Sequence, residues 1–182
     1  MTINVAHLLL LPLLLVAITP SMAEENAFIP DVTPRAPASV EPGKPWQEGT
    51  AQFPPWPQDT DLVELQIDGS TRRFRYFIDS RNLQVGSDQV VRYTLIAESG
   101  SGTRNLSYEG IRCTPKGRYK VFAYGLDGHF SPSENPDWRL ISDDRSEPYR
   151  NALWQFHFCI PRQFLPKTRK DIIRSLKLNL AN

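Results

Sequence analysis

The sequence is poor in the residue types on which metal and thiol redox chemistry depend. Its 182 residues include only 2 cysteines and 3 histidines, and one of these histidines, His7, lies in the apolar N-terminal stretch. A zinc site needs about four sulfur, imidazole or carboxylate ligands at suitable spacing. A thiol redox centre usually has the Cys-x-x-Cys spacing that lowers a thiol pKa. Neither pattern is present, so we expect no metal ion and no cofactor.

An excess of charge of one sign is also absent. Lysine and arginine total 21 and aspartate and glutamate 20, which gives a net charge of +1. Nucleic-acid-binding domains usually carry a clear basic excess, so we expect no nucleic-acid partner. The sequence also lacks the Gly-x-Ser-x-Gly motif, phosphate-binding loops, the dinucleotide fingerprint and the zinc-protease helix. No catalytic residue is therefore predicted from a motif.

A long hydrophobic run occurs only at the N-terminus. It ends in Ser21-Met22-Ala23, a small-residue pattern that suits signal-peptidase cleavage between Ala23 and Glu24. The run is short and interrupted by proline, whereas a membrane span needs about 20 apolar residues. We interpret residues 1–23 as a signal peptide and expect an exported chain, periplasmic or secreted, with no transmembrane segment after cleavage.

Proline, in contrast, is concentrated in one region. Half of the 16 prolines lie in residues 29–57, where there is almost no apolar periodicity. Such a segment favours extended conformations and buries too little surface to offset the entropy of ordering. We interpret residues 24–58 as a disordered tether, either a plain spacer or a ligand for a Pro-recognising groove. Its end can dock on the domain, because Trp46, Phe53 and Trp56 are costly to leave in water.

Residues 59–182 predict a single α+β domain, mainly an antiparallel β-sheet of about six to eight strands in a meander, with a C-terminal helix. Its centre is residues 90–124, three strands joined by turns at residues 99–102 and 114–117. Placing Ala97 opposite Arg104 gathers the apolar side chains on one face. The resulting pairs include Tyr93 with Tyr108, Leu95 with Leu106, Tyr108 with Ala123, and Gly110 with Val121.

Shorter elements flank this meander. Residues 62–67 and 72–78 form a hairpin that pairs Leu65 with Phe74. A turn-rich excursion follows over residues 125–136, and residues 138–141 form a short strand. Trp154, Phe156, Phe158 and Ile160 alternate with polar residues, which predicts a strand over residues 154–160. The helical spacing of Ile172, Ile173, Leu176 and Leu180 predicts an amphipathic helix over residues 167–180.

The two cysteines, Cys113 and Cys159, are predicted to form a disulfide. An oxidising compartment favours the bond, and closing a loop of this length stabilises a fold by about 4 kcal/mol. The bond requires Cα atoms about 4.4 to 6.8 Å apart, so the last strand must pass the Cys113 end of the meander.

Several polar and aromatic side chains are candidate site residues. Arg92 opposite Glu109 forms either a cross-strand ion pair or half of a polar site on that face. His157 is either a general base or a strand histidine hydrogen-bonded at the sheet edge, and His129 is the other candidate base. Phe130 and Trp138 are candidate aromatics for stacking on a ligand.

Two basic clusters are also apparent. They are Arg72-Arg73-Arg75 and the basic residues between Lys167 and Lys177. Each forms either a weak contact with an anionic surface or simply a solvated face.

A series of phrases resembles the cryptic neisserial protein-like (CNP-one-like) family of exported proteins. The phrases are Trp46-Gln47-Glu48, Pro55-Trp56-Pro57, Asp61-Leu62-Val63-Glu64, Val85-Gly86-Ser87-Asp88-Gln89-Val90-Val91-Arg92-Tyr93-Thr94-Leu95, Tyr108-Glu109-Gly110-Ile111-Arg112-Cys113 and Phe158-Cys159. They cover about residues 46–159. The resemblance implies an exported, functionally uncharacterised domain in which both cysteines belong to one unit. It assigns no catalytic residue.

These observations favour a non-catalytic binding or accessory module of the cell envelope. It would act through an exposed sheet face or the loop over residues 125–136, with an envelope protein or glycan as partner. Two alternatives are an envelope hydrolase, with His157 or His129 as general base, and a purely structural envelope protein.

Overall fold

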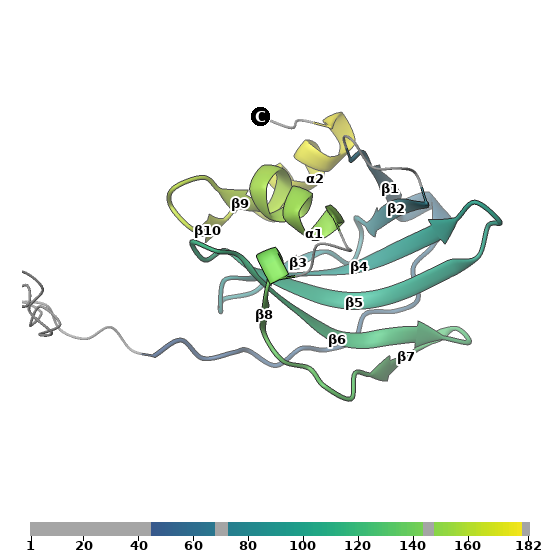
Figure 1. Cartoon of the computed structure of the whole chain (residues 1–182), viewed down its shortest axis with the longest axis horizontal. Helices are drawn as coiled ribbons and strands as arrows, with labels where there is room; N and C mark the ends of the chain where they lie inside the picture. The colour runs from purple at the N-terminus through teal and green to yellow at the C-terminus, as the bar shows by residue number, and fades with distance from the viewer. Residues whose placement is uncertain (1–44, 68–72, 144–147, 180–182) are drawn as a thin grey trace, which may run out of the picture. The chain divides into compact units, whose positions relative to one another are not determined.

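The computed structural model describes residues 45–67, 73–143 and 148–179, and residues 45–182 form one compact unit. Its centre is an eight-stranded antiparallel sheet in the order β1-β2-β4-β5-β6-β7, with β3 beside β4 and β8 beside β6 (Figure 1). These strands are β1 (Leu62–Leu65), β2 (Phe74–Asp79), β3 (Gln84–Val85), β4 (Val90–Ser99), β5 (Arg104–Arg112), β6 (Arg118–Leu126), β7 (His129–Pro132) and β8 (Arg139–Leu140). A two-stranded sheet pairs β9 (Cys159–Ile160) with β10 (Leu165–Pro166). The predicted fold class is confirmed.

The helices cover one face of the sheet, which we call the helix side (Figure 1). A 3₁₀ turn, η2 (Ile141–Asp143), precedes α1 (Pro148–Ala152), which continues into a π-helical turn, η3 (Leu153–Phe158). The predicted C-terminal helix is α2 (Arg169–Leu178), capped by Thr168, whose hydroxyl accepts a hydrogen bond from the Asp171 N–H. None of the helices in the described part of the chain has the length and apolar character needed to cross a membrane.

The main core lies between these helices and the sheet. The rings of Tyr93 on β4 and Phe158 meet edge to face, with centroids 5.1 Å apart. Ile172 and Leu176 of α2 are buried in the same cluster, so the apolar stripe read from the sequence does face the sheet.

The opposite face of the sheet, which we call the segment side, is covered by the extended residues 45–58. Phe53 packs edge to face on Tyr108, and Trp56 packs on Phe130, with ring centroids 6.1 and 5.6 Å apart. A short 3₁₀ turn, η1 (Asp59–Asp61), then leads into β1. The predicted domain boundary after residue 58 therefore falls inside the compact unit. Residues 24–44 of the predicted tether and the predicted signal peptide lie outside the described residues.

The register predicted for β4 and β5 is wrong by one residue. Tyr93 lies opposite Glu109 rather than Tyr108, and Arg92 lies opposite Gly110. The turn is tighter than assumed, because the Ser99 N–H donates to the Thr103 carbonyl at 2.9 Å and Gly102 adopts φ +83°. A three-residue loop ending in a left-handed glycine is a common hairpin turn. The one-residue slip moves Tyr108 and Glu109 to the faces opposite those predicted.

Other registers are partly confirmed. Tyr108 does lie opposite Ala123, but a bulge between Tyr108 and Glu109 then places Gly110 opposite Lys120 instead of Val121. In the first hairpin, Leu65 lies opposite Tyr76 rather than Phe74. This shift of two residues keeps every side chain on its predicted face. The turn of the first hairpin lies outside the described residues.

The strand predicted over residues 154–160 is also wrong, except for its last two residues. Residues 153–158 form the π-helical turn, and the side chains that it buries are Leu153, His157 and Phe158. That spacing follows a helical face. The aromatic side chains of Trp154 and Phe156, which suggested a strand by alternating with polar residues, are only half-buried.

The loop excursion predicted over residues 125–136 is largely ordered by strand pairing. β6 continues to Leu126 and pairs with β7 through a two-residue turn, Asp127-Gly128, in which both residues have positive φ. An aspartate-glycine pair with this conformation is a strong hairpin signal.

Candidate functional site

A cleft of about 690 Å³ opens on the helix side of the sheet. Its floor is formed by β2, β4, β5 and β6, one wall by α1 and the other wall by residues 131–139. The cleft therefore combines the two places, a sheet face and the loop after β6, where the sequence predicted a binding surface.

A buried carboxylate lies at the base of this cleft. Glu109 on β5 is only 1% exposed and accepts hydrogen bonds from the hydroxyls of Tyr93, Ser107 and Tyr149 at 3.0, 2.7 and 2.8 Å. Arg150 of α1 donates to both carboxylate oxygens, each at 3.0 Å. A buried ion pair with this many hydrogen bonds holds α1 in a fixed position over the sheet.

This network keeps Arg150, Tyr93 and Tyr149 protonated. Burial opposes the charge of Arg150, but the Glu109 carboxylate outweighs it and raises the pKa of Arg150. Burial, followed by the charge of Glu109, raises the pKa of Tyr93 and of Tyr149 well above 10. Both phenols therefore remain neutral hydrogen-bond donors at physiological pH.

The rim of the cleft combines aromatic, hydroxyl, amide and carboxylate groups. Tyr124 on β6 is 54% exposed, which leaves much of its ring open to a ligand. Ser133, Glu134, Asn135 and Asp137 line the opposite wall. An exposed aromatic ring beside planar polar groups suits both stacking and hydrogen bonding with a ligand.

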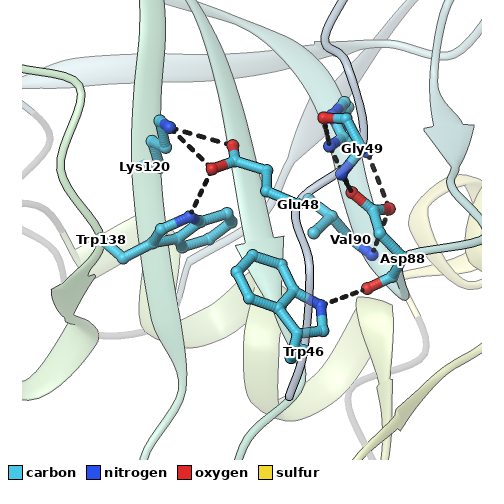
Figure 2. Close-up of polar contacts among 8 residues, drawn as sticks. Trp46, Glu48, Gly49, Asp88, Val90, Lys120 and Trp138 are labelled. Carbon is cyan, nitrogen blue, oxygen red and sulfur yellow. Dashed lines mark hydrogen bonds and ion pairs between the residues drawn. The ribbon is translucent and has the colours of Figure 1, made fainter. Parts of the chain in front are cut away.

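The segment side carries a second polar cluster, which anchors residues 45–58 (Figure 2). The Trp46 indole N–H donates to the Asp88 carbonyl at 2.8 Å, and the Gly49 N–H donates to the Asp88 carboxylate at 2.8 Å. Lys120 donates to both oxygens of Glu48 at 2.9 Å, and the Trp138 indole N–H donates to Glu48 at 3.2 Å. The residues named in the first family phrase therefore fix the segment to the sheet.

Asp88 also holds Arg92, which has a side chain only 5% exposed. Burial would raise the pKa of Asp88, but hydrogen bonds from Arg92, Gly49 and Val90 lower it to about 2. Asp88 therefore remains an anion through the physiological range.

The predicted pair of Arg92 with Glu109 is wrong. With the corrected register, Arg92 lies on the segment side and binds Asp88, whereas Glu109 lies on the helix side and binds Arg150. The correct partner, Arg150, is 41 residues away in sequence. The sequence contains one signal for the hydrogen-bond network around Glu109, namely the i, i+2 spacing of Ser107 and Glu109 on one strand. Using that signal required the correct register of β5 against β4.

The two candidate ligand-stacking aromatics are used within the fold. Phe130 packs against Phe53, Trp56 and Tyr108, and Trp138 meets Trp46 edge to face at 5.7 Å. Both are only half-buried, but neither lines the cleft described above. Tyr124, which sequence reasoning missed, is the exposed aromatic that does.

The two candidate catalytic histidines lie apart from the cleft. His157 is buried at 1% exposure, and its Nδ1 lies 2.9 Å from the Ser175 hydroxyl. Burial, with a smaller contribution from Lys167, lowers the pKa of His157 to about 4. His129 is exposed at the start of β7, with Nδ1 3.3 Å from the Asp127 carbonyl. His157 is therefore a neutral side chain in the core rather than at the sheet edge.

The predicted disulfide is present. Cys113 and Cys159 are bonded, with Cα atoms 5.6 Å apart.

The two predicted basic clusters each contain an arginine whose side chain is bonded within the fold. Arg75 of the first basic cluster pairs with Glu64 and Glu98, and Arg169 of the second donates to the carbonyls of Ser80, Arg81 and Leu83. Within the residues that the structure describes, no three His, Cys, Asp or Glu side chains are arranged to hold a metal ion. Arg72, Ala23 and Glu24 lie outside those residues.

These features define a class of protein, an antiparallel β-sheet domain cross-linked by a disulfide, with a polar and aromatic cleft beside its first helix. The chain belongs to the CNP1-like family, whose model matches residues 41–177. This confirms the resemblance found in residues 46–159. No curated protein and no solved structure matches the chain.

Proposed function

We propose that this chain is a non-catalytic binding or accessory module of the cell envelope, exported to the periplasm or secreted, and that it holds its partner in the cleft. The observation that carries the proposal is the cleft itself, of about 690 Å³, lined by exposed Tyr124 and by polar residues that include Ser133, Asn135 and Asp137. The apolar leader and the disulfide support export, since disulfides persist in oxidising compartments.

The chemistry of the cleft favours recognition over reaction. Glu109 and Arg150 neutralise each other, and both carboxylate oxygens already accept hydrogen bonds. The open groups are an aromatic ring, hydroxyls, amides, carboxylates and the guanidinium of Arg139, which suit a glycan or an extended stretch of an envelope protein. The hydrolase alternative assigned the base to His129 or His157, and neither histidine lines the cleft.

The proposal is tested in a strain that lacks the chain, by restoring resistance to envelope-stressing detergent. Ser133→Arg places a long cation in the cleft wall, and we expect it to fail to restore resistance. Ser87→Arg is the matched control, because Ser87 is exposed in the turn before β4 and lies outside the cleft. Both variants must first show native circular dichroism and an intact disulfide.

Full restoration by Ser133→Arg would contradict the proposal. The hydrolase alternative is tested with the double variant His129→Gln/His157→Gln, which removes both candidate bases. We expect this variant to restore resistance if it folds. Loss of function in a folded double variant would favour the hydrolase.

A further inference from the structure

Two surface turns are held together at one end of the domain by the disulfide. Cys113 directly precedes the β5–β6 turn, and Cys159 begins the small sheet whose turn spans residues 161–164. Figure 1 shows both turns at the same end of the unit, beside the label of β10. We call the exposed residues of these two turns, with the flanking Arg112, Arg118 and Leu165, the turn surface.

The turn surface contains cations that the fold does not neutralise. Arg112, Lys116, Arg118 and Arg162 have no carboxylate within ion-pair distance among residues 45–67, 73–143 and 148–179. Arg112 and Arg118 lie directly opposite each other on β5 and β6. Like charges in that position destabilise a sheet, and an anionic partner would relieve this repulsion.

Arg112 is held in place for such a contact. Its guanidinium stacks 3.8 Å from the centroid of the Trp46 ring. Burial, followed by the charge of Arg118, lowers the pKa of Arg112, which is consistent with a cation that lacks an anionic neighbour.

The other end of the same strands is arranged differently. Arg104, at the start of β5, pairs with Asp59 and Glu98, and Arg75 pairs with Glu64 and Glu98. The exposed cations there are paired with carboxylates. The turn surface therefore groups four cations that are unpaired among the described residues, whereas the opposite end of the same strands has paired ones.

The turn surface also exposes apolar side chains. Phe164 and Leu165 are 42% and 41% exposed. Phe164 has φ +55° and Arg162 has φ +66°, left-handed conformations that are unfavourable for bulky residues. A strained backbone that displays a phenylalanine to solvent points to a contact outside the domain.

We propose that the turn surface docks on an anionic phospholipid membrane. Phe164 and Leu165 would enter the headgroup region, and the four cations would lie against lipid phosphates. The combination of exposed apolar residues and flanking cations is what an anionic bilayer surface binds. This surface is distinct from the two basic clusters seen in the sequence and from the cleft, which it leaves open to its own partner.

The proposal is tested by co-sedimentation with vesicles of phosphatidylglycerol and phosphatidylcholine, against phosphatidylcholine alone. The protein is recovered from the periplasm of an expression host, and its N-terminus is determined by mass spectrometry. We expect binding to the anionic vesicles at least tenfold stronger, and weaker binding at high salt.

Two variants separate the charge from the apolar contribution. Lys116→Glu/Arg118→Glu should lower the partition coefficient by about 25-fold or more, at about fivefold for each cation lost. Phe164→Asn should lower it by about tenfold while leaving thermal stability unchanged or higher, because asparagine tolerates the left-handed conformation. Lys170→Glu/Lys177→Glu on α2 is the matched control, with the same change in net charge at exposed positions elsewhere.

Equal binding to both vesicle types, or an equal loss in the α2 control, would overturn the proposal. Absence of vesicle binding would also overturn it. So would a Phe164-dependent dimer in sedimentation velocity, because the turn surface would then be an interface between two copies of the chain.

Discussion

Glu109 is the residue whose charge most directly stabilises the helix side of the domain. Replacing it by glutamine leaves the buried guanidinium of Arg150 without a counter-charge. We expect Glu109→Gln to lower the free energy of unfolding by about 3 to 5 kcal/mol. Denaturant unfolding measures the change. The double variant Glu109→Gln/Arg150→Met removes both charges, so its free energy of unfolding should fall less than that of the single variant. A decrease below about 1 kcal/mol in Glu109→Gln would contradict this account.

His157 gives the domain a specific pH dependence. Its folded pKa of about 4 lies below the unfolded value of 6.5, so the unfolded chain binds the proton first as pH falls. The contribution of neutral His157 to the free energy of unfolding is therefore complete above pH 6.5. It decreases as pH falls toward 4, by about 3 kcal/mol in total. His157→Gln should remove this component from unfolding curves measured at pH 7.5, 5.5 and 4.5. His129→Gln is the exposed control, and the same pH slope in wild type and His157→Gln would refute the assignment.

At the scale of elements, the N-terminal segment docks on the sheet through the aromatic side chains expected to be costly to leave in water. Trp46 makes an indole hydrogen bond to Asp88, an edge contact with Trp138 and a stack with Arg112. We expect Trp46→Ala to lower the free energy of unfolding by about 2 kcal/mol and to open residues 45–58 to limited proteolysis. Gln52→Ala, at an exposed position of the same segment, should change neither the free energy of unfolding nor the rate of proteolysis. Unchanged proteolysis in Trp46→Ala would show that other contacts hold the segment.

The disulfide joins the β5–β6 turn to the end of the π-helical turn. Its 46-residue separation predicts a stabilisation of about 4 kcal/mol, which is a large fraction of the 5 to 15 kcal/mol typical of a domain. Cys113→Ala/Cys159→Ala, or reduction, should therefore lower the melting temperature by many degrees. An unchanged melt in strong reductant, with both thiols confirmed by labelling, would contradict the prediction.

The errors in predicting these elements have local physical causes. The apolar pattern favoured the wrong register for β4 and β5, because it placed Leu106 and Tyr108 on the same face as Leu95 and Tyr93. The three-residue turn with left-handed Gly102 instead places Ser107 and Glu109 on that face. The π-helical turn was mistaken for a strand because Trp154 and Phe156 alternate with polar residues while Leu153, His157 and Phe158 are the side chains buried. The sheet class, α2 and the disulfide were predictable, since each depends on a periodicity or on a chemistry with few alternatives.

At the scale of the whole molecule, the cleft was only partly predictable. Either a sheet face or the loop over residues 125–136 was expected to bind a partner. The position of α1 as a wall of the same cleft was not expected. It depends on the bond between Arg150 and Glu109, which are 41 residues apart in the sequence. Tyr124 was missed for a related reason, since its place in the cleft depends on the arrangement of β6, residues 131–139 and α1.

The most direct test of the binding account is site-specific photo-crosslinking in intact cells. A photoreactive residue replaces either Tyr124, in the cleft, or Leu126, two residues further along β6, outside the cleft and similarly exposed at 59% against 54%. Mass spectrometry of the crosslinked peptides then identifies the partner directly. We predict a discrete, saturable adduct from position 124 that is absent from position 126 and is lost in Ser133→Arg. Equal labelling from both positions, or no adduct from position 124 in folded, exported protein, would contradict the proposal that the cleft binds an envelope component.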